Sequence, residues 1–112
     1  MAERMLVIMK RLTECEEIVM SVIWDSDSRM NLPQIVESVN RRYGRNWAMQ
    51  TVSTFLARLR KKKVVDAERV GRTFFYNVLM SKQEYITQVA QHVCEFWFDG
   101  DAEKMANAVK KE

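Results

Sequence analysis

Residues 48–62 read AMQTVSTFLARLRKK and have the apolar spacing of a single helix with two chemically different faces. Apolar residues recur at intervals of three and four, which at about 100° per residue places them on one narrow face. These residues are Val52, Phe55, Leu56 and Leu59. The opposite side of the helix carries short or hydrogen-bonding side chains near its start and cationic side chains near its end. These residues are Gln50, Ser53, Thr54, Arg58 and Lys61. We therefore expect one face to pack on a core and the other to meet a partner.

Two runs rich in β-branched and aromatic residues follow this helix, at 64–70 and 73–78. Gly71 and Arg72 separate the two runs, and this is the two-residue spacing of a β-hairpin. Because Arg69 lies beside the turn and Arg72 lies in it, the sequence predicts a hairpin with a cationic tip.

The first helix of the chain is predicted from a capping box. Thr13 and Glu16 have the S/T-x-x-E spacing, in which each side chain satisfies a free amide of the first helical turn. An apolar stripe at helical spacing then continues to Trp24. We expect a helix that begins at Thr13 and packs its stripe on the core.

A second helix is predicted before residue 48. Residues 25–28 form a polar turn, and residues 29–32 are expected to form a short strand. Asn31 and Pro33 mark the start of the helix, because Pro is tolerated in a first helical turn. Gly44 is placed to end it.

Two more helices are predicted after the hairpin. Residues 81–84 form another capping box, and residues 99–101, DGD, interrupt the chain before a last amphipathic segment. The apolar faces are broad for one chain to bury, so we expect a second subunit to cover them. The residues expected at this dimer interface are Tyr85, Val89, Val93, Phe96, Trp97, Met105 and Val109.

The net charge of the chain is only +3, but the charges are unevenly distributed. Residues 41–72 hold ten basic and two acidic residues, a net +8, whereas the remainder holds eight basic and thirteen acidic residues, a net −5. A cationic centre between acidic flanks favours a polyanionic partner. The alternative interpretation is a solvated cationic face, and charge alone does not choose between the two.

Three helices followed by a cationic hairpin are typical of a winged helix-turn-helix, whose third helix enters the major groove of DNA. Near the start of such a helix, Gln pairs with adenine and a Thr methyl contacts thymine. Cationic side chains contact phosphates. The residues expected to contact DNA are Gln50, Ser53 and Thr54, then Arg58 and Lys61, with Arg72 in the hairpin and Arg42 and Arg45 in the turn entering the helix. Trp47 is expected to anchor that turn.

Catalysis and metal binding are poorly supported by the sequence. The chain contains no nucleophile-elbow, zinc-protease or phosphate-loop motif. Cys15 and Cys94 are isolated, and His92 is the only histidine, so a metal site would lack converging ligands. We expect a protein that is not an enzyme and has no cofactor.

Two observations bear on localisation. The sequence has no apolar stretch of about 18 residues, which a membrane-spanning helix would need. The apolar run at residues 5–9 is too short for the core of a signal peptide. We therefore expect a cytoplasmic protein that does not insert into a membrane.

Three sets of motifs, in their order and spacing, resemble the BlaI/MecI/CopY family of penicillinase and methicillin-resistance repressors. The first is LTECE at 12–16 with VM at 19–20 and IW at 23–24, similar to the opening helix of that family. The second is TV at 51–52 with LARLRKK at 56–62, similar to its recognition helix. The third is RTFFY at 72–76 with SKQEY at 81–85, similar to its wing and the start of its dimerisation helix. The similarity covers about residues 12–100.

The resemblance implies a homodimer that binds inverted-repeat operators and represses resistance or stress genes. It implies that the C-terminal helices dimerise and that a membrane sensor-protease, or another protease, relieves repression by cleavage there. It places DNA contacts on Gln50, Thr51, Ser53, Thr54, Arg58 and Arg72.

Three features depart from the family pattern. Glu17 stands where the family often has Trp, so the packing of the first helix is expected to differ. Lys63 stands where Gly is frequent before the first wing strand. The C-terminal cysteine cluster of the copper-responsive branch is missing, which argues against copper sensing.

The sequence is interpreted as a mainly α protein with a small β-hairpin. Residues 10–80 would form a winged-helix DNA-binding domain, and residues 81–112 a helical dimerisation segment. The predicted function is a transcriptional repressor that binds double-stranded operator DNA as a homodimer. Two alternatives stay open: a protein-interaction module that does not read DNA, and a ligand-sensing regulator with a pocket between the two segments.

Overall fold

A computed structural model describes residues 11–111, and these fall into two compact units. One unit spans Leu12–Ser81, and the described residues of the other are 11 and 82–111. The apolar run at residues 5–9 lies outside the described residues. No helix within the described residues combines the length and the hydropathy needed to cross a membrane.

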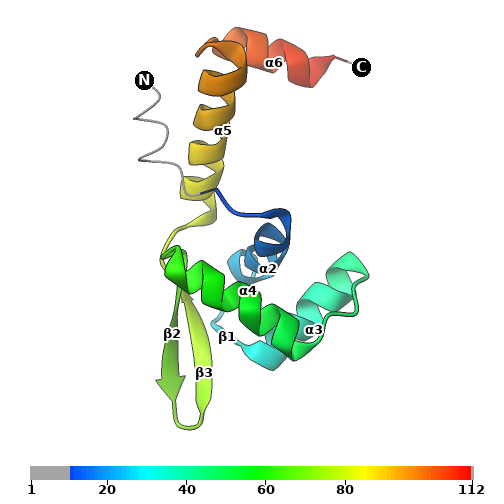
Figure 1. Cartoon of the computed structure of the whole chain (residues 1–112), viewed down its shortest axis with the longest axis vertical. Coiled ribbons are helices and arrows are strands. Elements are labelled where there is room, and N and C mark those ends of the chain that lie inside the picture. Colours follow the sequence, from blue (N-terminus) through cyan, green and yellow to red (C-terminus); the bar gives the residue numbers. More distant parts are fainter. Residues whose placement is uncertain (1–10, 112) are drawn as a thin grey trace. The chain divides into compact units, whose positions relative to one another are not determined.

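The Leu12–Ser81 unit contains three helices and a small sheet (Figure 1). Its elements in chain order are α2 (Glu14–Trp24), β1 (Met30–Asn31), α3 (Leu32–Tyr43), α4 (Met49–Lys61), β2 (Val65–Val70) and β3 (Thr73–Val78). The predicted fold class, mainly helical with a β-hairpin, is confirmed. The predicted strand before the second helix also forms, and it pairs antiparallel with β3. The two-stranded hairpin expected from the sequence is therefore part of a three-stranded sheet of order β1-β3-β2.

Local signals in the sequence account for the ends of the first two helices. Thr13 and Glu16 form the predicted capping box at the start of α2. Asn31 caps α3 in the same way, with Gln34 as its reciprocal partner. Gly44 ends α3 in the left-handed conformation, with φ of 61°, which glycine adopts without a Cβ clash.

The helices α2, α3 and α4 pack against one another around an apolar core. The fully buried apolar side chains include Val19, Met20, Ile35, Val39, Val52, Leu56, Leu59, Val64 and Val65. The prediction that Phe55 belongs to this core is wrong, because its side chain is only half-buried. It lies at the edge of the helix pack, with its ring 5.2 Å from that of Trp47.

A buried ion pair joins the start of α2 to the end of α4. Glu16 is only 1% exposed, and its Oε1 lies 2.6 Å from Nζ of Lys62. The same oxygen accepts a 2.9 Å hydrogen bond from the Thr13 amide. Burial acts to raise the pKa of Glu16, but the hydrogen bonds from Lys62 and Thr13 outweigh it and hold that pKa below its ordinary value.

The end of α4 is a Schellman motif with a lysine in the glycine position. The Val64 amide donates to the Leu59 carbonyl at 3.0 Å, and the Lys63 amide donates to the Arg60 carbonyl at 3.0 Å. Lys63 has φ of 63°, in the left-handed region that favours glycine. Lys63, which stands where the resembled family frequently has Gly, is therefore in a strained backbone conformation.

The second unit contains the helices α5 (Lys82–Phe98) and α6 (Ala102–Lys110). Asp99 and Gly100 both have positive φ, which confirms the predicted interruption between α5 and α6. Asp101 then caps α6 by accepting hydrogen bonds from the amides of Glu103 and Lys104. Tyr85 is buried, whereas α6 has no buried residue.

Replacing Lys63 by glycine should stabilise the protein. The left-handed conformation costs a residue with a Cβ about 1 kcal/mol or more, part of which is offset by the greater freedom of glycine in the unfolded chain. We expect Lys63→Gly to raise the free energy of unfolding by about 0.5–1 kcal/mol in urea denaturation followed by circular dichroism. Lys63→Ala removes the same charge but keeps a Cβ, so an equal gain from alanine would contradict this explanation.

Breaking the ion pair should destabilise the protein in a pH-dependent way. Lys62→Met leaves the Glu16 carboxylate buried without its cation, and we expect a loss of about 1–3 kcal/mol at pH 7. This is less than for a fully buried pair because Lys62 is one-third exposed. Since the pKa of Glu16 is lowered by folding, the stabilisation is present above the unfolded pKa of about 4.3 and is lost as the pH falls through the folded pKa.

Urea denaturation from pH 7 to pH 3 measures this dependence. The difference between the wild type and Lys62→Met should shrink toward acid. Lys61→Met is the matched control, because Lys61 is exposed and forms no ion pair among the described residues. A difference that stays constant with pH would show that the loss comes from packing rather than from charge.

Candidate nucleic-acid interface

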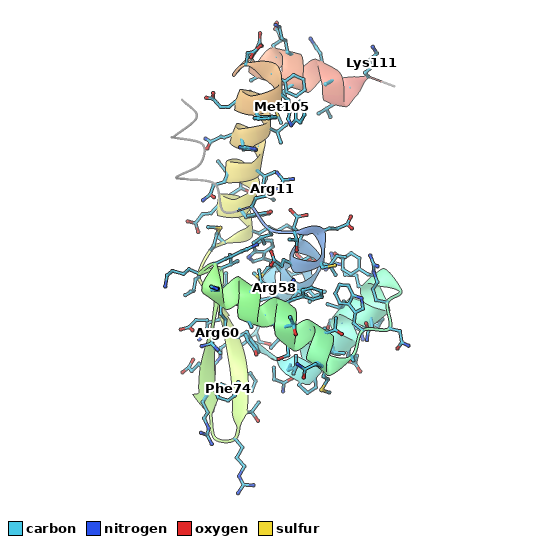
Figure 2. All side chains as sticks on the ribbon, in the orientation of Figure 1. Arg11, Arg58, Arg60, Phe74, Met105 and Lys111 are labelled. Atoms are coloured by element: carbon cyan, nitrogen blue, oxygen red, sulfur yellow. The ribbon has the colours of Figure 1, made fainter. Side chains whose placement is uncertain are left out.

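The outward face of α4 is polar at its N-terminal end and cationic at its C-terminal end. Gln50, Thr54, Arg58 and Lys61 are exposed there, while Thr51 and Ser53 are half-buried on the flanks of the helix. The Thr54 hydroxyl donates to the Gln50 carbonyl at 3.0 Å, so it is held against the helix with an acceptor lone pair still available. Figure 2 labels Arg58 on this helix, where the residue is exposed.

A stack of cations and aromatic rings lies beside the outward face. The Arg45 guanidinium lies 5.5 Å from the centre of the Trp47 ring, which contacts Phe55 in turn. Arg58 lies 5.8 Å from the centre of the Phe55 ring on the helix itself. Two arginines expected from the sequence to contact phosphate are thus placed along one aromatic ridge, where stacking limits their motion.

The turn that leads into α4 is held by a side chain of α3. The Asn40 side chain donates from Nδ2 to the Trp47 backbone carbonyl at 3.0 Å, and its Oδ1 accepts from the Trp47 backbone amide at 2.9 Å. This bidentate contact fixes the backbone beside Arg45. The expectation that Trp47 anchors the turn agrees with these bonds and with its contact to Phe55.

Arg42 is engaged with a carboxylate of its own chain. Its Nη1 lies 2.7 Å from Oδ2 of Asp25, and the hydrogen bond to Asp25 is the main cause that raises the pKa of Arg42 above its ordinary value. Tyr43, the next residue, shares a short hydrogen bond with Ser21. The end of α3 is therefore tied to α2, and Arg42 could contact a phosphate only beside or in place of Asp25.

The hairpin ends in a cationic turn. Arg72 is exposed in the turn beside Gly71, whose φ is 65°. Arg69 is also exposed, and its Nε donates to the Gly71 carbonyl at 2.9 Å. This bond closes the tip with the cationic group of Arg69 drawn toward the turn.

The two acidic residues of the cationic segment 41–72 are both paired. Asp66 lies 3.7 Å from Arg60, and Glu68 pairs with Arg29 on the loop before β1. Six exposed cations of the segment, by contrast, have no carboxylate within ion-pair distance among the described residues. They are Arg45, Arg58, Lys61, Lys63, Arg69 and Arg72. The positive charge predicted from the sequence is therefore largely unneutralised where it lies on the surface.

The structure places all nine expected DNA-contact residues in the Leu12–Ser81 unit. It brings four of them together on the outward face of α4 and sets Arg45 beside that face through Trp47. Arg72 lies apart, at the hairpin tip. The sequence did not single out Phe74, an exposed aromatic residue on the hairpin, because a strand pattern does not show where the core ends in space.

The residues expected at a dimer interface differ in exposure. Tyr85 is buried, Val89, Val93 and Met105 are half-buried, and three are exposed. The exposed ones are Phe96 at 56%, Trp97 at 71% and Val109 at 78%. The Phe96 and Trp97 rings meet edge to face at 4.8 Å on α5. This helix thus presents an aromatic pair that its own unit does not cover.

The residues that the structure describes contain neither a group of potential metal ligands nor a disulfide. In that part of the chain no three His, Cys, Asp or Glu side chains are grouped as metal ligands would be. Cys15 and Cys94 are both free thiols and half-buried.

Comparisons with known proteins agree on one family. The family model described as penicillinase repressor matches residues 12–112. The penicillinase repressor of Bacillus licheniformis is 25% identical over 95 residues, which cover 85% of this chain and 72% of that protein.

Two solved structures resemble the chain. The DNA-binding domain of the repressor BlaI, solved in solution, is 28% identical with a TM-score of 0.57, over 67% of this chain and 88% of that one. The monomeric form of Bacillus licheniformis BlaI in complex with the blaP half-operator is 27% identical with a TM-score of 0.56, over 69% of this chain and 90% of that one. With its sequence matched from residue 12 onward and its helices and sheet matching a winged-helix domain, the chain belongs to the penicillinase repressor family.

Proposed function

We propose that this chain is a transcriptional repressor that binds operator DNA as a homodimer. The observation that carries the proposal is the outward face of α4, where hydrogen-bonding side chains precede cations that have no ion-pair partner among residues 11–111. A relative of similar fold is bound to a half-operator. A helix with this distribution fits the major groove, where polar side chains read base edges and cations hold the phosphates.

The roles of the side chains follow from their positions. We infer that Gln50 and Thr54 contact base edges, with Thr51 and Ser53 beside them on the flanks of the helix. Arg58 and Lys61 would contact phosphates from the end of α4, and Arg45 would do so from the ridge formed with Trp47. Arg72 would reach DNA from the hairpin. Arg42 would add a phosphate contact next to its bond with Asp25.

The two units would have different tasks. We assign DNA binding to residues 10–80 and dimerisation to residues 81–112. The exposed aromatic pair of Phe96 and Trp97, with Val109 on α6, supports this division, because large exposed apolar groups mark interaction sites. In a two-fold dimer, the recognition helices would occupy successive major grooves about 34 Å apart.

Release of repression by proteolysis is part of the proposal. The helix α6 buries none of its residues, and segments with few buried contacts open most easily to a protease. A membrane sensor-protease or another protease would remove this segment and weaken the dimer. Because operator DNA lies in the bacterial cytoplasm, the repressor would act there, without enzyme activity of its own.

Replacing Gln50 should weaken specific binding to DNA. We expect Gln50→Ala to lose about tenfold in affinity for DNA from upstream of its own gene, because a bidentate base contact is removed. Binding to a scrambled duplex should stay the same. Fluorescence anisotropy at two salt concentrations measures both, and affinity should fall steeply as salt rises because phosphate contacts release counterions.

The matched control is Gln91→Ala, which removes an exposed glutamine from α5. An equal loss on both duplexes would mean that Gln50 does not read bases. Binding that is equal on both duplexes for the wild type, or insensitive to salt, would overturn the DNA-binding proposal. It would then favour a protein-interaction module.

Truncating Trp97 should weaken the dimer. Its side chain is 71% exposed in the single chain, and buried tryptophans dominate many interfaces. We expect Trp97→Ala to raise the dimer dissociation constant by tenfold or more, on the order of 2 kcal/mol, in sedimentation equilibrium. Gln91→Ala again serves as the control. A wild-type chain that stays monomeric at high concentration would count against the homodimer.

A further inference from the structure

The outer part of the hairpin is a two-stranded arm without support from the third strand. β1 pairs only with Phe75 and Tyr76 of β3. Beyond them, toward the turn, β2 and β3 pair only with each other, with Arg69 opposite Phe74 and Val70 opposite Thr73. Figure 1 shows the hairpin projecting from the helices of its unit.

Phe74 lies on this arm with about half of its surface exposed to water. Strand alternation places it on the same face as Tyr76, which pairs with the buried Met30. This face packs on the core at the base of the hairpin, but at Phe74 the core has ended and the side chain is 52% exposed. Figure 2 shows Phe74 on the outer part of the hairpin. An aromatic side chain held in water at this point adds little to the stability of the fold.

The other face of the arm is braced and electrically neutral. The Arg29 guanidinium lies 5.3 Å from the centre of the Phe75 ring and pairs with Glu68. The Asn77 amide donates to the same Glu68 oxygen at 3.0 Å. The Glu68 carboxylate is thus satisfied on the face away from Phe74, and Arg69 and Arg72 give the tip its charge.

An exposed ring beside a cationic tip fits a surface that is anionic at its edges and apolar within. The minor groove of DNA has this chemistry, with phosphates along its rims and deoxyribose carbons lining its walls. Proteins that bind there combine arginines with apolar side chains placed against the base steps. With α4 in the major groove, a projecting arm of the same unit would meet the flanking minor groove.

We propose that Phe74 is a DNA-contacting residue, whose ring packs against the sugar and base edges of the minor groove flanking each half-site. Arg69 and Arg72 hold phosphates from the tip of the hairpin beside it. This inference rests on the proposed function and adds to it an apolar contact made by the hairpin.

The first test compares Phe74→Ala with the wild type on the duplex from upstream of its own gene. We expect about a tenfold loss of affinity, with the dependence on salt unchanged, because no ionic contact is removed. Arg72→Ala should instead lower the slope of log affinity against log salt by about one. The matched control is Val78→Ala, an apolar residue on the same face of the same strand, 43% exposed at the base of the hairpin. It should bind as the wild type does.

The second test identifies the groove. Inosine in place of guanine in the pairs flanking the half-site removes the only minor-groove amino group and leaves the major-groove pattern intact. The wild type should bind this duplex more tightly than the parent, and Phe74→Ala should bind the two equally. Wild-type affinity in Phe74→Ala, or an equal response of both proteins to inosine, would overturn the proposal.

These outcomes separate the inference from the function on which it rests. If Gln50→Ala weakens binding but Phe74→Ala does not, the protein reads DNA without the contact proposed for Phe74. If the wild type does not distinguish the native duplex from a scrambled one, the proposed function fails, and the inference with it. An unchanged unfolding midpoint for Phe74→Ala, expected for an exposed side chain, shows that a loss of binding is not a loss of folding.

Discussion

The contact between Glu16 and Lys62 is the constraint on which the arrangement of the DNA-binding unit depends. A carboxylate that is 1% exposed is tolerated only when its oxygens are bonded, and here one oxygen serves both the cap of α2 and the ammonium group at the end of α4. The start of one helix and the end of another are therefore held at one point. Any rotation of α4 that turned its outward face would pull Lys62 away from Glu16.

The region around the end of α4 also fixes the position of the hairpin. Directly after Lys62 the chain turns through Lys63, and the Val64 carbonyl accepts hydrogen bonds from the amides of Leu79 and Met80, where β3 ends. Trp24 then donates from its indole to the Met80 carbonyl at 2.9 Å. The end of α4, both ends of the hairpin and the end of α2 are thus linked within a few residues. The hydrogen bonds on both sides of Lys63 hold the turn in place, so its strained backbone persists there, and α4 and the hairpin meet a ligand as one body.

The sequence predicted the parts of this fold that depend on near neighbours. The caps at Thr13 and Asn31 and the period of α4 involve residues within one or two turns, so their spacing is visible in the chain. Glu16 and Lys62 are 46 residues apart, and nothing in the spacing of either shows that a capping glutamate is also a buried ion-pair partner. The pairing of Arg42 with Asp25 and the exposure of Phe74 were missed for the same reason. Each depends on where the core ends in space, which periodicity does not specify.

The distribution of paired and unpaired charge explains why one copy of this unit would be a weak reader of sequence. Asp25, Asp66 and Glu68 pair with Arg42, Arg60 and Arg29, which leaves Arg58 and Lys61 on the outward face of α4 to give that face a positive field. Cations supply affinity for any DNA, whereas discrimination must come from the short polar stretch around Gln50 and Thr54. The related BlaI forms a complex with a half-operator as a monomer, so in that protein one half-site is enough for contact. Joining two such units makes the second binding event intramolecular, and its effective concentration multiplies a modest preference at each half-site.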